Sequence, residues 1–338
     1  MASLASRRIL IVKTSSLGDV VHALPAVTDL VEACPAAGVD WVVEEAFADI
    51  PRLHPGVAQV IPVALRGWRR APLAGSTRSA VAAVRARLRA GRYDVVIDCQ
   101  GLVKSAVLAR WARAPVAGYD RRSAREPLAT LWYDRRFRVD RALHAIVRNR
   151  TLVAAAAGYA MHGPPRFGIA PPPAADGGAT VPETYAVLLT NASRATKRWP
   201  DAHWRAVAES LAALGLPSLL FWGSDDERIA TAARAARMPD ARVMPRATIA
   251  AIAAVLARAR VVVGLDTGLT HLAAALGAPT LGIFCDYDPS LVGVVGDAAT
   301  VSLGSAVAGP GVDDVLAALP RLLAADASAG TRAACAAS

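Results

Sequence analysis

The sequence predicts an α/β protein of two domains, each built on a parallel sheet that helices cover on both faces. Three observations lead to this prediction. The chain has 338 residues, which at roughly 100–200 residues per domain accommodates two full cores. Short apolar runs of strand length alternate with stretches whose apolar residues recur at helical spacing. A segment rich in proline and glycine interrupts this alternation near the middle of the chain.

In the first half, the alternation begins close to the N-terminus. The apolar run RRILIVK predicts a first strand, and a loop rich in serine leads from it into a helix over residues 20–34. The remaining elements follow the same pattern, with buried strands at 39–45, 58–65 and 93–101 and helices at 79–91 and 102–112. We therefore predict an N-terminal domain over residues 1–165 and a linker over residues 166–182.

In the second half, strands and helices alternate again. Strands are predicted at 185–190, 217–223, 241–245, 260–266 and 279–284, and helices at 202–214, 227–236, 249–259 and from residue 270. A C-terminal domain is thus expected over residues 183–326, with a flexible tail at 327–338. Because ligands of open α/β sheets bind beyond the carboxyl ends of the strands, the cleft between the two domains is the expected site.

Composition excludes several classes of protein. A hydrophobic content of 54% excludes a disordered chain, and no uninterrupted apolar run approaches the ~18 residues that a membrane-spanning helix needs. The N-terminus leads directly into a strand with no signal-peptide pattern, so we expect a cytoplasmic protein. The four cysteines stand too far apart for a zinc site or a disulfide framework, and are Cys34, Cys99, Cys285 and Cys335.

Positive charge is concentrated in the first half of the chain. Residues 1–165 carry 22 Arg and 2 Lys against 13 acidic residues, a net charge of +11, whereas residues 166–338 carry a net charge of −1. This asymmetry indicates an anionic partner for the first half: a nucleic acid, a membrane surface or a phosphorylated substrate. A merely solubilising surface is the alternative for any single arginine.

Lysine is rare in this sequence. Of the 38 basic residues, 35 are arginine, and only Lys13, Lys104 and Lys197 are lysine. A lysine ammonium approaches a phosphate or carboxylate as a compact point charge, which a planar guanidinium does not reproduce. Chance placement is the alternative, but all three lysines lie in segments that have other features of a functional site.

The loop after the first strand, residues 13–19, reads KTSSLGD. It contains a single glycine and matches neither the dinucleotide fingerprint nor the P-loop. It does place Asp19 at the first turn of a helix, close in sequence to Lys13 and His22. Asp19 is therefore either a functional carboxylate directed into the cleft or a helix cap.

Three loops of the second half have features of a nucleotide site. The segment GLDTGLTH (264–271) leads from a strand into a helix N-terminus, whose free N–H groups and dipole favour a phosphate, although Asp266 as a cap in a plain turn is the alternative. The loop at 190–200 offers hydroxyl groups and Lys197 for further phosphate contacts. The loop at 222–227 places acidic residues where they could bind the hydroxyl groups of a ribose. For Asp225 and Asp226, however, the favoured interpretation is that they are acidic residues of a solvated loop.

Eight ordered segments give the chain a family resemblance. They are KTSSLGDVVHALPAVTDL, WVVEE, IPVALRGWRR, VIDCQGLVKSA, AREPLA, KRWP, FWGSDDE and VGLDTGLTHLAAAL. Together they resemble the lipopolysaccharide heptosyltransferases of the ADP-heptose glycosyltransferase family, over about residues 9–296. The resemblance implies a GT-B fold of two Rossmann-like domains facing across a cleft, and transfer of L-glycero-D-manno-heptose from ADP-heptose to the inner Kdo of Kdo2-lipid A.

The resemblance also implies roles for individual residues. Asp19 corresponds to the family's catalytic base, and Ala192 departs from a position where related sequences often carry threonine. The positions that correspond to donor-contacting residues are Ser193, Lys197, Glu227, Asp266, Thr267, Gly268 and His271. The expected acceptor-contacting residues are Lys13, Arg66, Arg69, Arg70, Lys104 and Arg125.

An anionic acceptor of this kind accounts for the charge asymmetry better than a nucleic acid does, since no nucleic-acid-binding module is recognisable. The basic segment 65–70, which includes Trp68, is also expected to seat the protein on an anionic inner-membrane leaflet without spanning it. The expected location is therefore peripheral, on the cytoplasmic face of the inner membrane.

The expected reaction is a single inverting displacement in which Asp19 takes the proton of the acceptor hydroxyl. The helix that begins near Thr267, together with Lys197, then stabilises the departing ADP. No cofactor is expected, and no metal, because no DxD-type pair of carboxylates appears in a setting that suggests a metal site. The alternatives are a heptosyltransferase II-like enzyme acting on an already heptosylated acceptor, a nucleotide-sugar epimerase, and a non-catalytic protein that binds an anionic glycolipid.

Overall fold

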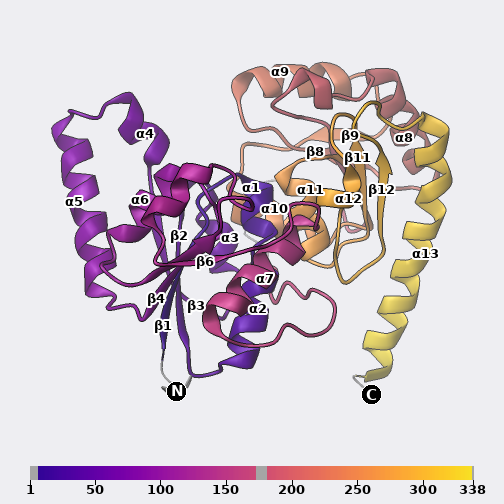
Figure 1. Ribbon diagram of the computed structural model, residues 1–338. Coiled ribbons are helices and arrows are strands. Elements are labelled where there is room, and N and C mark those ends of the chain that lie inside the picture. Colours follow the sequence, from indigo (N-terminus) through magenta and orange to yellow (C-terminus); the bar gives the residue numbers. More distant parts are fainter. Residues whose placement is uncertain (1–6, 173–180, 337–338) are drawn as a thin grey trace. The chain divides into compact units, whose positions relative to one another are not determined.

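The computed structural model describes the backbone of residues 7–172 and 181–336, with side chains up to residue 324 (Figure 1). The chain forms two compact units, residues 1–169 (unit 1) and residues 170–338 (unit 2). The boundary between them falls inside the predicted linker, and residues 173–180 of that linker lie outside the described residues. Each unit is therefore described separately.

Unit 1 is built on a six-stranded sheet with helices on both faces. In chain order its elements are β1 (Arg8–Val12), α1 (Leu17–Val21), α2 (Leu24–Ala33), β2 (Gly38–Glu44), η2 (Glu45–Phe47), α3 (Asp49–Arg52), β3 (Val57–Val63), α4 (Leu65–Arg70), α5 (Gly75–Ala90), β4 (Val95–Asp98), α6 (Val103–Arg110), β5 (Val116–Tyr119), η3 (Pro127–Trp132), β6 (Arg135–Phe137) and α7 (Ala145–Ala157).

All strand pairs of this sheet are parallel, in the order β3-β2-β1-β4-β5-β6. This is the doubly wound order, in which the chain runs outward from β1 in one direction and then from β4 in the other. The switch point therefore lies between β1 and β4. The loops that follow the carboxyl ends of these two strands diverge at this point. These loops contain residues 13–16 and 99–102.

The core of unit 1 explains why β1 lies in the middle of the sheet. Its residues alternate between two buried faces, as a central parallel strand requires. Leu10 and Val12 belong to a buried cluster with Leu88 of α5 and Leu108 of α6. On the other face, α2 and α7 pack against each other, as Figure 1 shows.

Unit 2 repeats this architecture. Its elements are β7 (Ala186–Leu189), η4 (Ala195–Lys197), α8 (Asp201–Ala213), β8 (Ser218–Leu220), α9 (Asp225–Ala235), β9 (Ala241–Val243), α10 (Ile249–Leu256), β10 (Val261–Leu265), α11 (Gly268–Ala275), β11 (Thr280–Phe284), α12 (Pro289–Val292), β12 (Thr300–Gly304) and α13 (Val312–Ala336).

The sheet of unit 2 is again parallel, in the order β12-β11-β10-β7-β8-β9. Its switch point lies between β7 and β10, so the loops that begin at Thr190 and Asp266 meet there. Trp204 of α8 and Leu319 of α13 belong to one buried cluster with Leu265, at the end of β10. The two predicted parallel sheets are thus confirmed.

Several elements were not predicted from the sequence. The strands β5 and β6 are short, and the exposed edge strand β6 reads RRF, which offers no apolar run for pattern recognition. The strand β12 reads TVSLG, which also contains no continuous apolar run. The helices α4, α7 and α13 were also missed. The helix α13 continues through residues 327–336 of the predicted tail, and the last two residues of that tail lie outside the described part.

Two predictions from composition can be compared with the structure. Cys34 and Cys99 are buried, Cys285 is half-buried, and all three are free thiols, whereas the Cys335 side chain lies outside the described residues. Within the described ranges, no helix combines the length and the apolar character needed to cross a membrane.

Candidate functional site

Asp19 lies just after the loop that leaves β1, at the switch point of unit 1. It is the third residue of α1, and its Oδ2 accepts hydrogen bonds from the N–H and the hydroxyl of Ser16, both at 2.9 Å. These bonds satisfy backbone and hydroxyl donors at the start of a helix. Asp19 thus has the capping geometry that the sequence left open, while its Oδ1 faces Lys13.

Two cations lie beside the Asp19 carboxylate. Nζ of Lys13 is 3.8 Å from Oδ1, and a guanidinium nitrogen of Arg125 is 3.9 Å from Oδ2. Burial opposes the ionised form, but Lys13, the N–H of Ser16 and Arg125 together outweigh it and hold the pKa of Asp19 below its ordinary value. With its side chain 30% exposed, Asp19 is an ionised carboxylate that solvent reaches.

Lys13 is held in place from several directions. Its side chain is only 8% exposed, and its ammonium donates to the carbonyl of Cys99 at 2.9 Å. Its own carbonyl accepts a hydrogen bond from the indole N–H of Trp41 at 3.1 Å. These contacts fix the ammonium group at the side of Asp19, inside the switch point.

Gln100 was not expected from the sequence. It follows β4, and its Oε1 accepts hydrogen bonds from the backbone N–H groups of Thr14 and Ser15, at 3.0 and 3.1 Å. One buried amide oxygen therefore holds the loop that leads to Asp19. The sequence could have predicted this contact, because Gln100 lies at the end of a predicted strand. In a doubly wound sheet, the loops that follow the first and fourth strands lie close together.

The loop that carries Gln100 is in turn held by Asp98, the last residue of β4. Asp98 is fully buried and accepts hydrogen bonds from the backbone N–H groups of Gln100 (2.9 Å) and Gly101 (3.3 Å). The hydroxyls of Ser105 (2.8 Å) and Tyr133 (2.7 Å) also donate to it. Burial raises the pKa of Asp98 even though these donors favour its charged form.

The remaining residues predicted to contact the acceptor lie on other elements. Arg66, Arg69 and Arg70 are exposed on α4, and within the described residues none of them pairs with a carboxylate. The backbone N–H of Arg66 donates to Glu44 at 3.1 Å, which anchors the start of α4. Lys104 is exposed on α6. Of the predicted acceptor residues, the structure brings only Lys13 and Arg125 to Asp19.

At the switch point of unit 2, Asp266 stands between Lys197 and His271. The Lys197 ammonium contacts Oδ2 of Asp266 and also donates to its backbone carbonyl at 2.9 Å, while Nε2 of His271 lies 3.2 Å from Oδ1. Burial opposes ionisation of Asp266, but His271 and then Lys197 outweigh it and lower its pKa. The structure therefore brings together three of the residues predicted to bind the donor.

The turn after Asp266 opens the N-terminus of α11. Thr267 precedes the helix and Gly268 is its first residue, while Thr270 donates its hydroxyl to the carbonyl of Leu265 at 2.6 Å. Gly264 is required for this close packing, because a Cβ there would lie 2.3 Å from the Thr270 hydroxyl oxygen. The first N–H groups of α11 thus face the switch point, as an anion site needs.

The other two residues predicted to bind the donor have different surroundings. Glu227 lies in the first turn of α9, where its Oε2 accepts from the N–H of Gly223 at 2.7 Å and its own N–H donates to Ser224 at 3.3 Å. Ser224 is thus the N-cap of α9, and the Glu227 carboxylate also holds the residue before that cap. Ser193 is exposed in the loop after β7, where Arg194 instead bonds Asp286 at 3.2 Å.

Metal ligands are not gathered anywhere in the described part of the chain, where no three His, Cys, Asp or Glu side chains could hold an ion together. Unit 1 presents an ionised carboxylate beside two cations, and unit 2 presents a helix N-terminus beside a lysine.

Comparison with known proteins identifies the family. Residues 81–314 match the sequence model of glycosyltransferase family 9 (heptosyltransferase). Lipopolysaccharide heptosyltransferase 1 of Pseudomonas aeruginosa is 46% identical over 300 residues, which cover 88% of this chain and 84% of the relative. The Escherichia coli protein of the same name is 43% identical, over 86% and 91% of the two chains.

Solved structures agree with this result. The E. coli heptosyltransferase WaaC with ADP matches with a TM-score of 0.84 and 39% identity, over 93% of this chain and 99% of that one. E. coli ADP-heptose lps heptosyltransferase II matches with a TM-score of 0.75 at 19% identity, which shows the shared fold. The predicted GT-B fold is thus confirmed. By its sequence and its fold, the chain belongs to glycosyltransferase family 9, the heptosyltransferases.

Proposed function

We propose that this glycosyltransferase moves L-glycero-D-manno-heptose from ADP-heptose to the inner Kdo of Kdo2-lipid A, the reaction of a heptosyltransferase I. The observation that carries the proposal is the identity of 41–46% to four lipopolysaccharide heptosyltransferases 1 over at least 86% of this chain. A heptosyltransferase 2 is 28% identical over only 31% of it. This contrast favours the first heptose transfer over the second.

In the proposed reaction, Asp19 is the catalytic base. Its low pKa keeps the carboxylate ready to accept the proton of the acceptor hydroxyl as that oxygen attacks the anomeric carbon. The new glycosidic bond forms on one face of the sugar while the bond to the ADP oxygen breaks on the other, which inverts the configuration. Lys13 and Arg125 stabilise the ionised base before the proton arrives.

Unit 2 is proposed to bind ADP-heptose and to stabilise the departing ADP. The N–H groups at the start of α11 attract a diphosphate, and Lys197 offsets the charge of Asp266, which would otherwise repel it. WaaC structures contain ADP in one case and ADP-2-deoxy-2-fluoro heptose in another. Their similarity to this chain supports a donor of the same chemistry.

The acceptor and the location belong to the same proposal. Kdo carboxylates and lipid A phosphates match the exposed arginines of α4, whose charge no carboxylate in the described residues neutralises. Because lipid A is embedded in a bilayer, the location that we propose for the enzyme is the cytoplasmic face of the inner membrane.

ADP release measured with two acceptors tests the proposal. We expect turnover with Kdo2-lipid A and much less with the same acceptor already carrying one heptose. The reverse preference would assign the second heptose transfer instead. Binding of either glycolipid without ADP release from ADP-heptose would make the chain a non-catalytic binding protein.

A further inference from the structure

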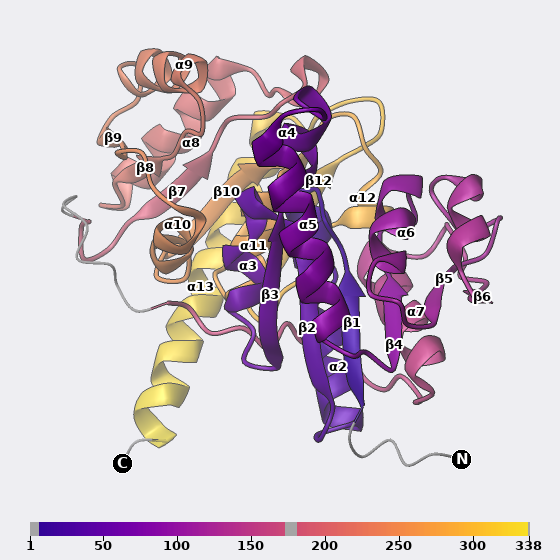
Figure 2. The same cartoon turned by 90° about the vertical axis from the view of Figure 1, so that its left-hand side faces the viewer.

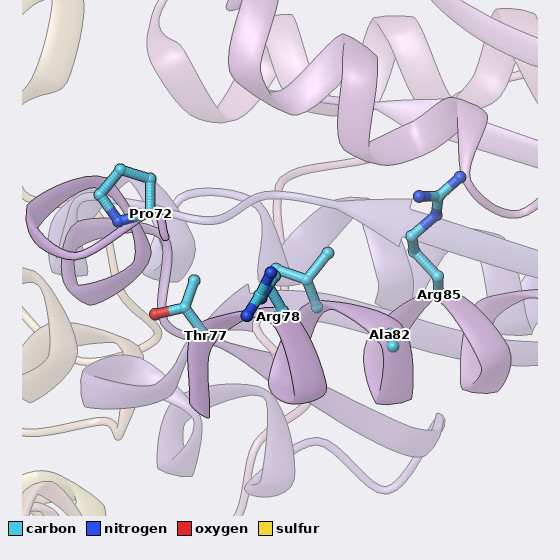
Figure 3. Close-up of a pocket in the computed structure, with 6 residues that line it drawn as sticks. Pro72, Thr77, Arg78, Ala82 and Arg85 are labelled. Carbon is cyan, nitrogen blue, oxygen red and sulfur yellow. The ribbon is translucent and has the colours of Figure 1, made fainter. Parts of the chain in front are cut away.

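A basic surface of unit 1 lies outside the residues assigned to the acceptor. Residues 50–93 contain no Asp or Glu and nine arginines, of which only the three on α4 are assigned to the acceptor. Within this stretch, Arg78, Arg85 and Arg89 are spaced by seven and four residues along α5, which places them on one side of the helix. Figure 3 shows Arg78, Ala82 and Arg85 following one another along this side.

Among the described residues, Arg78, Arg85 and Arg89 pair with no carboxylate, unlike two other helical arginines of the chain. Arg205 pairs with Glu209 on α8, and Arg228 pairs with Asp225 on α9, each within one helical turn. On α5 no acid is available at such spacing. The charge of Arg113 and then that of Arg85 lower the pKa of Arg89, which shows like charges held close together. An anionic partner that covers this cluster would offset the repulsion between its arginines.

Apolar and aromatic groups accompany this charge. Leu73, in the turn between α4 and α5, is 85% exposed. The half-buried rings of Trp68 and Trp111 have centroids 6.4 Å apart, and the Arg85 guanidinium lies 5.6 Å from the Trp111 ring. An open pocket of about 300 Å³ beside them is lined by Pro72, Thr77, Arg78, Val81, Ala82 and Arg85.

The helix α5 is exposed along its length. Of its 16 residues only Leu88 is fully buried. Figures 1 and 2 show α4 and α5 at the periphery of unit 1, on the side opposite α2 and α7. The arginine stripe is therefore open to a large, flat partner.

We propose that this surface, formed by Leu73, Arg78, Arg85, Arg89, Trp111 and Arg113, docks unit 1 on a bilayer of anionic phospholipids. Phosphate groups meet the arginines, the half-buried Trp111 ring lies at headgroup depth, and Leu73 enters the acyl region. A nucleic acid would use the charge but would offer no apolar layer for Leu73. The inference extends the proposed function, because it names the residues that hold the enzyme where its acceptor lies.

Vesicle partitioning of the full chain tests the inference without any acceptor present. Wild-type protein should bind vesicles of phosphatidylcholine mixed with phosphatidylglycerol and bind poorly to phosphatidylcholine alone. The triple variant R78Q/R85Q/R89Q should bind the mixed vesicles about 100-fold more weakly, since each arginine near the surface is worth about fivefold. Leu73→Ser should weaken binding by at least about fivefold, largely independent of salt.

A matched control variant distinguishes the effect of this particular surface from the effect of the protein's net charge. R237Q/R242Q/R246Q removes three exposed arginines of unit 2 and should keep partitioning within about twofold of wild type. Equal losses in both triple variants would overturn the inference, as would wild-type partitioning in the α5 variant. Thermal melts and ADP titration show that each variant is folded.

Two further measurements exclude other partners. Binding that appears only when Kdo2-lipid A is added to the vesicles would overturn the inference and assign the surface to the acceptor. Tight binding of a DNA duplex that is lost in R78Q/R85Q/R89Q, together with no vesicle binding, would assign it to a nucleic acid. ADP release with a deacylated, water-soluble acceptor should be unchanged in the α5 variants, so failure of docking and failure of the proposed reaction are distinguishable.

Discussion

The side-chain oxygen of Gln100 accepts a hydrogen bond from the backbone N–H of Ser15 at 3.1 Å, across a sequence separation of 85 residues. The same oxygen accepts the N–H of Thr14 at 3.0 Å. Through this contact the loop after β4 determines the path of the loop after β1. The position of the Asp19 carboxylate therefore depends on a residue in the loop after a different strand.

Gln100→Ala should impair both stability and turnover. The substitution leaves two backbone N–H groups without their acceptor, at a cost of about 1–3 kcal/mol when such groups are buried. We expect a lower melting temperature and a reduced kcat with an unchanged KM for ADP-heptose, because the donor residues belong to unit 2. Gln59→Ala, at an exposed glutamine of β3, is the control and should change neither the melting temperature nor kcat. Normal kcat in Gln100→Ala would show that the loop keeps its path without this bond.

Asp19→Asn separates the two roles of that side chain. The amide oxygen can still accept from Ser16, so the cap is retained, but the side chain can no longer take a proton. Turnover should fall by about 10²–10⁴-fold while ADP affinity stays near wild type. Steady-state kinetics and calorimetric titration measure the two quantities. Turnover above about a tenth of wild type would leave Asp19 with the capping role alone.

Lys197→Ala should weaken the binding of ADP. Loss of a charge-assisted contact costs about 1.5–3 kcal/mol, and here it also leaves Asp266 with less compensation beside the diphosphate. Calorimetry with ADP should show an affinity reduced by at least about tenfold. Arg198→Ala, the exposed neighbour, is the control. Equal ADP affinity in the two variants would remove Lys197 from the donor site.

Arg69→Glu should raise the KM for Kdo2-lipid A and leave the KM for ADP-heptose unchanged. The residue is exposed on α4, so the effect should shrink as salt rises from about 50 to about 500 mM. Arg246→Glu in unit 2 makes the same charge change and should affect neither KM. If acceptor kinetics at low salt match those of the wild type, α4 does not contact the acceptor.

His54 should make unit 1 less stable in mild acid. The residue is 3% exposed, its Nδ1 accepts from the N–H of Gly56 at 3.0 Å, and its Nε2 lies 2.9 Å from the Thr28 hydroxyl. Burial lowers the pKa of His54 from 6.5 to about 4. Between these values the unfolded chain binds the proton more readily, so stability is complete above about pH 6.5 and is lost as pH falls toward about 4.

Urea denaturation measures this loss. From about pH 7.5 to about pH 5, His54 should reduce the free energy of unfolding by about 2 kcal/mol. His54→Gln does not titrate in this range and should show a correspondingly smaller decrease. An unchanged pH dependence in that variant would place the acid sensitivity at other groups.

The sequence by itself determined the class of fold and the segments that matter. Apolar periodicity is a local property, so the alternation of strands and helices could be read along the chain, as could the placement of Asp19 and Asp266 just after strands. The order of the eight segments was specific enough for the family. The absence of acids from residues 50–93 is equally visible in the sequence.

Only the tertiary structure decided which side chains meet. Lys13 bonds the carbonyl of Cys99, Gln100 captures Ser15, and Lys197 pairs with Asp266, contacts between residues 86, 85 and 69 positions apart. Such pairs follow from strand order, since the first and fourth strands of each sheet become neighbours only when the sheet assembles. Periodicity along a chain carries no information on that order. The low pKa of Asp19 is therefore a property of the assembled sheet, not of its own segment.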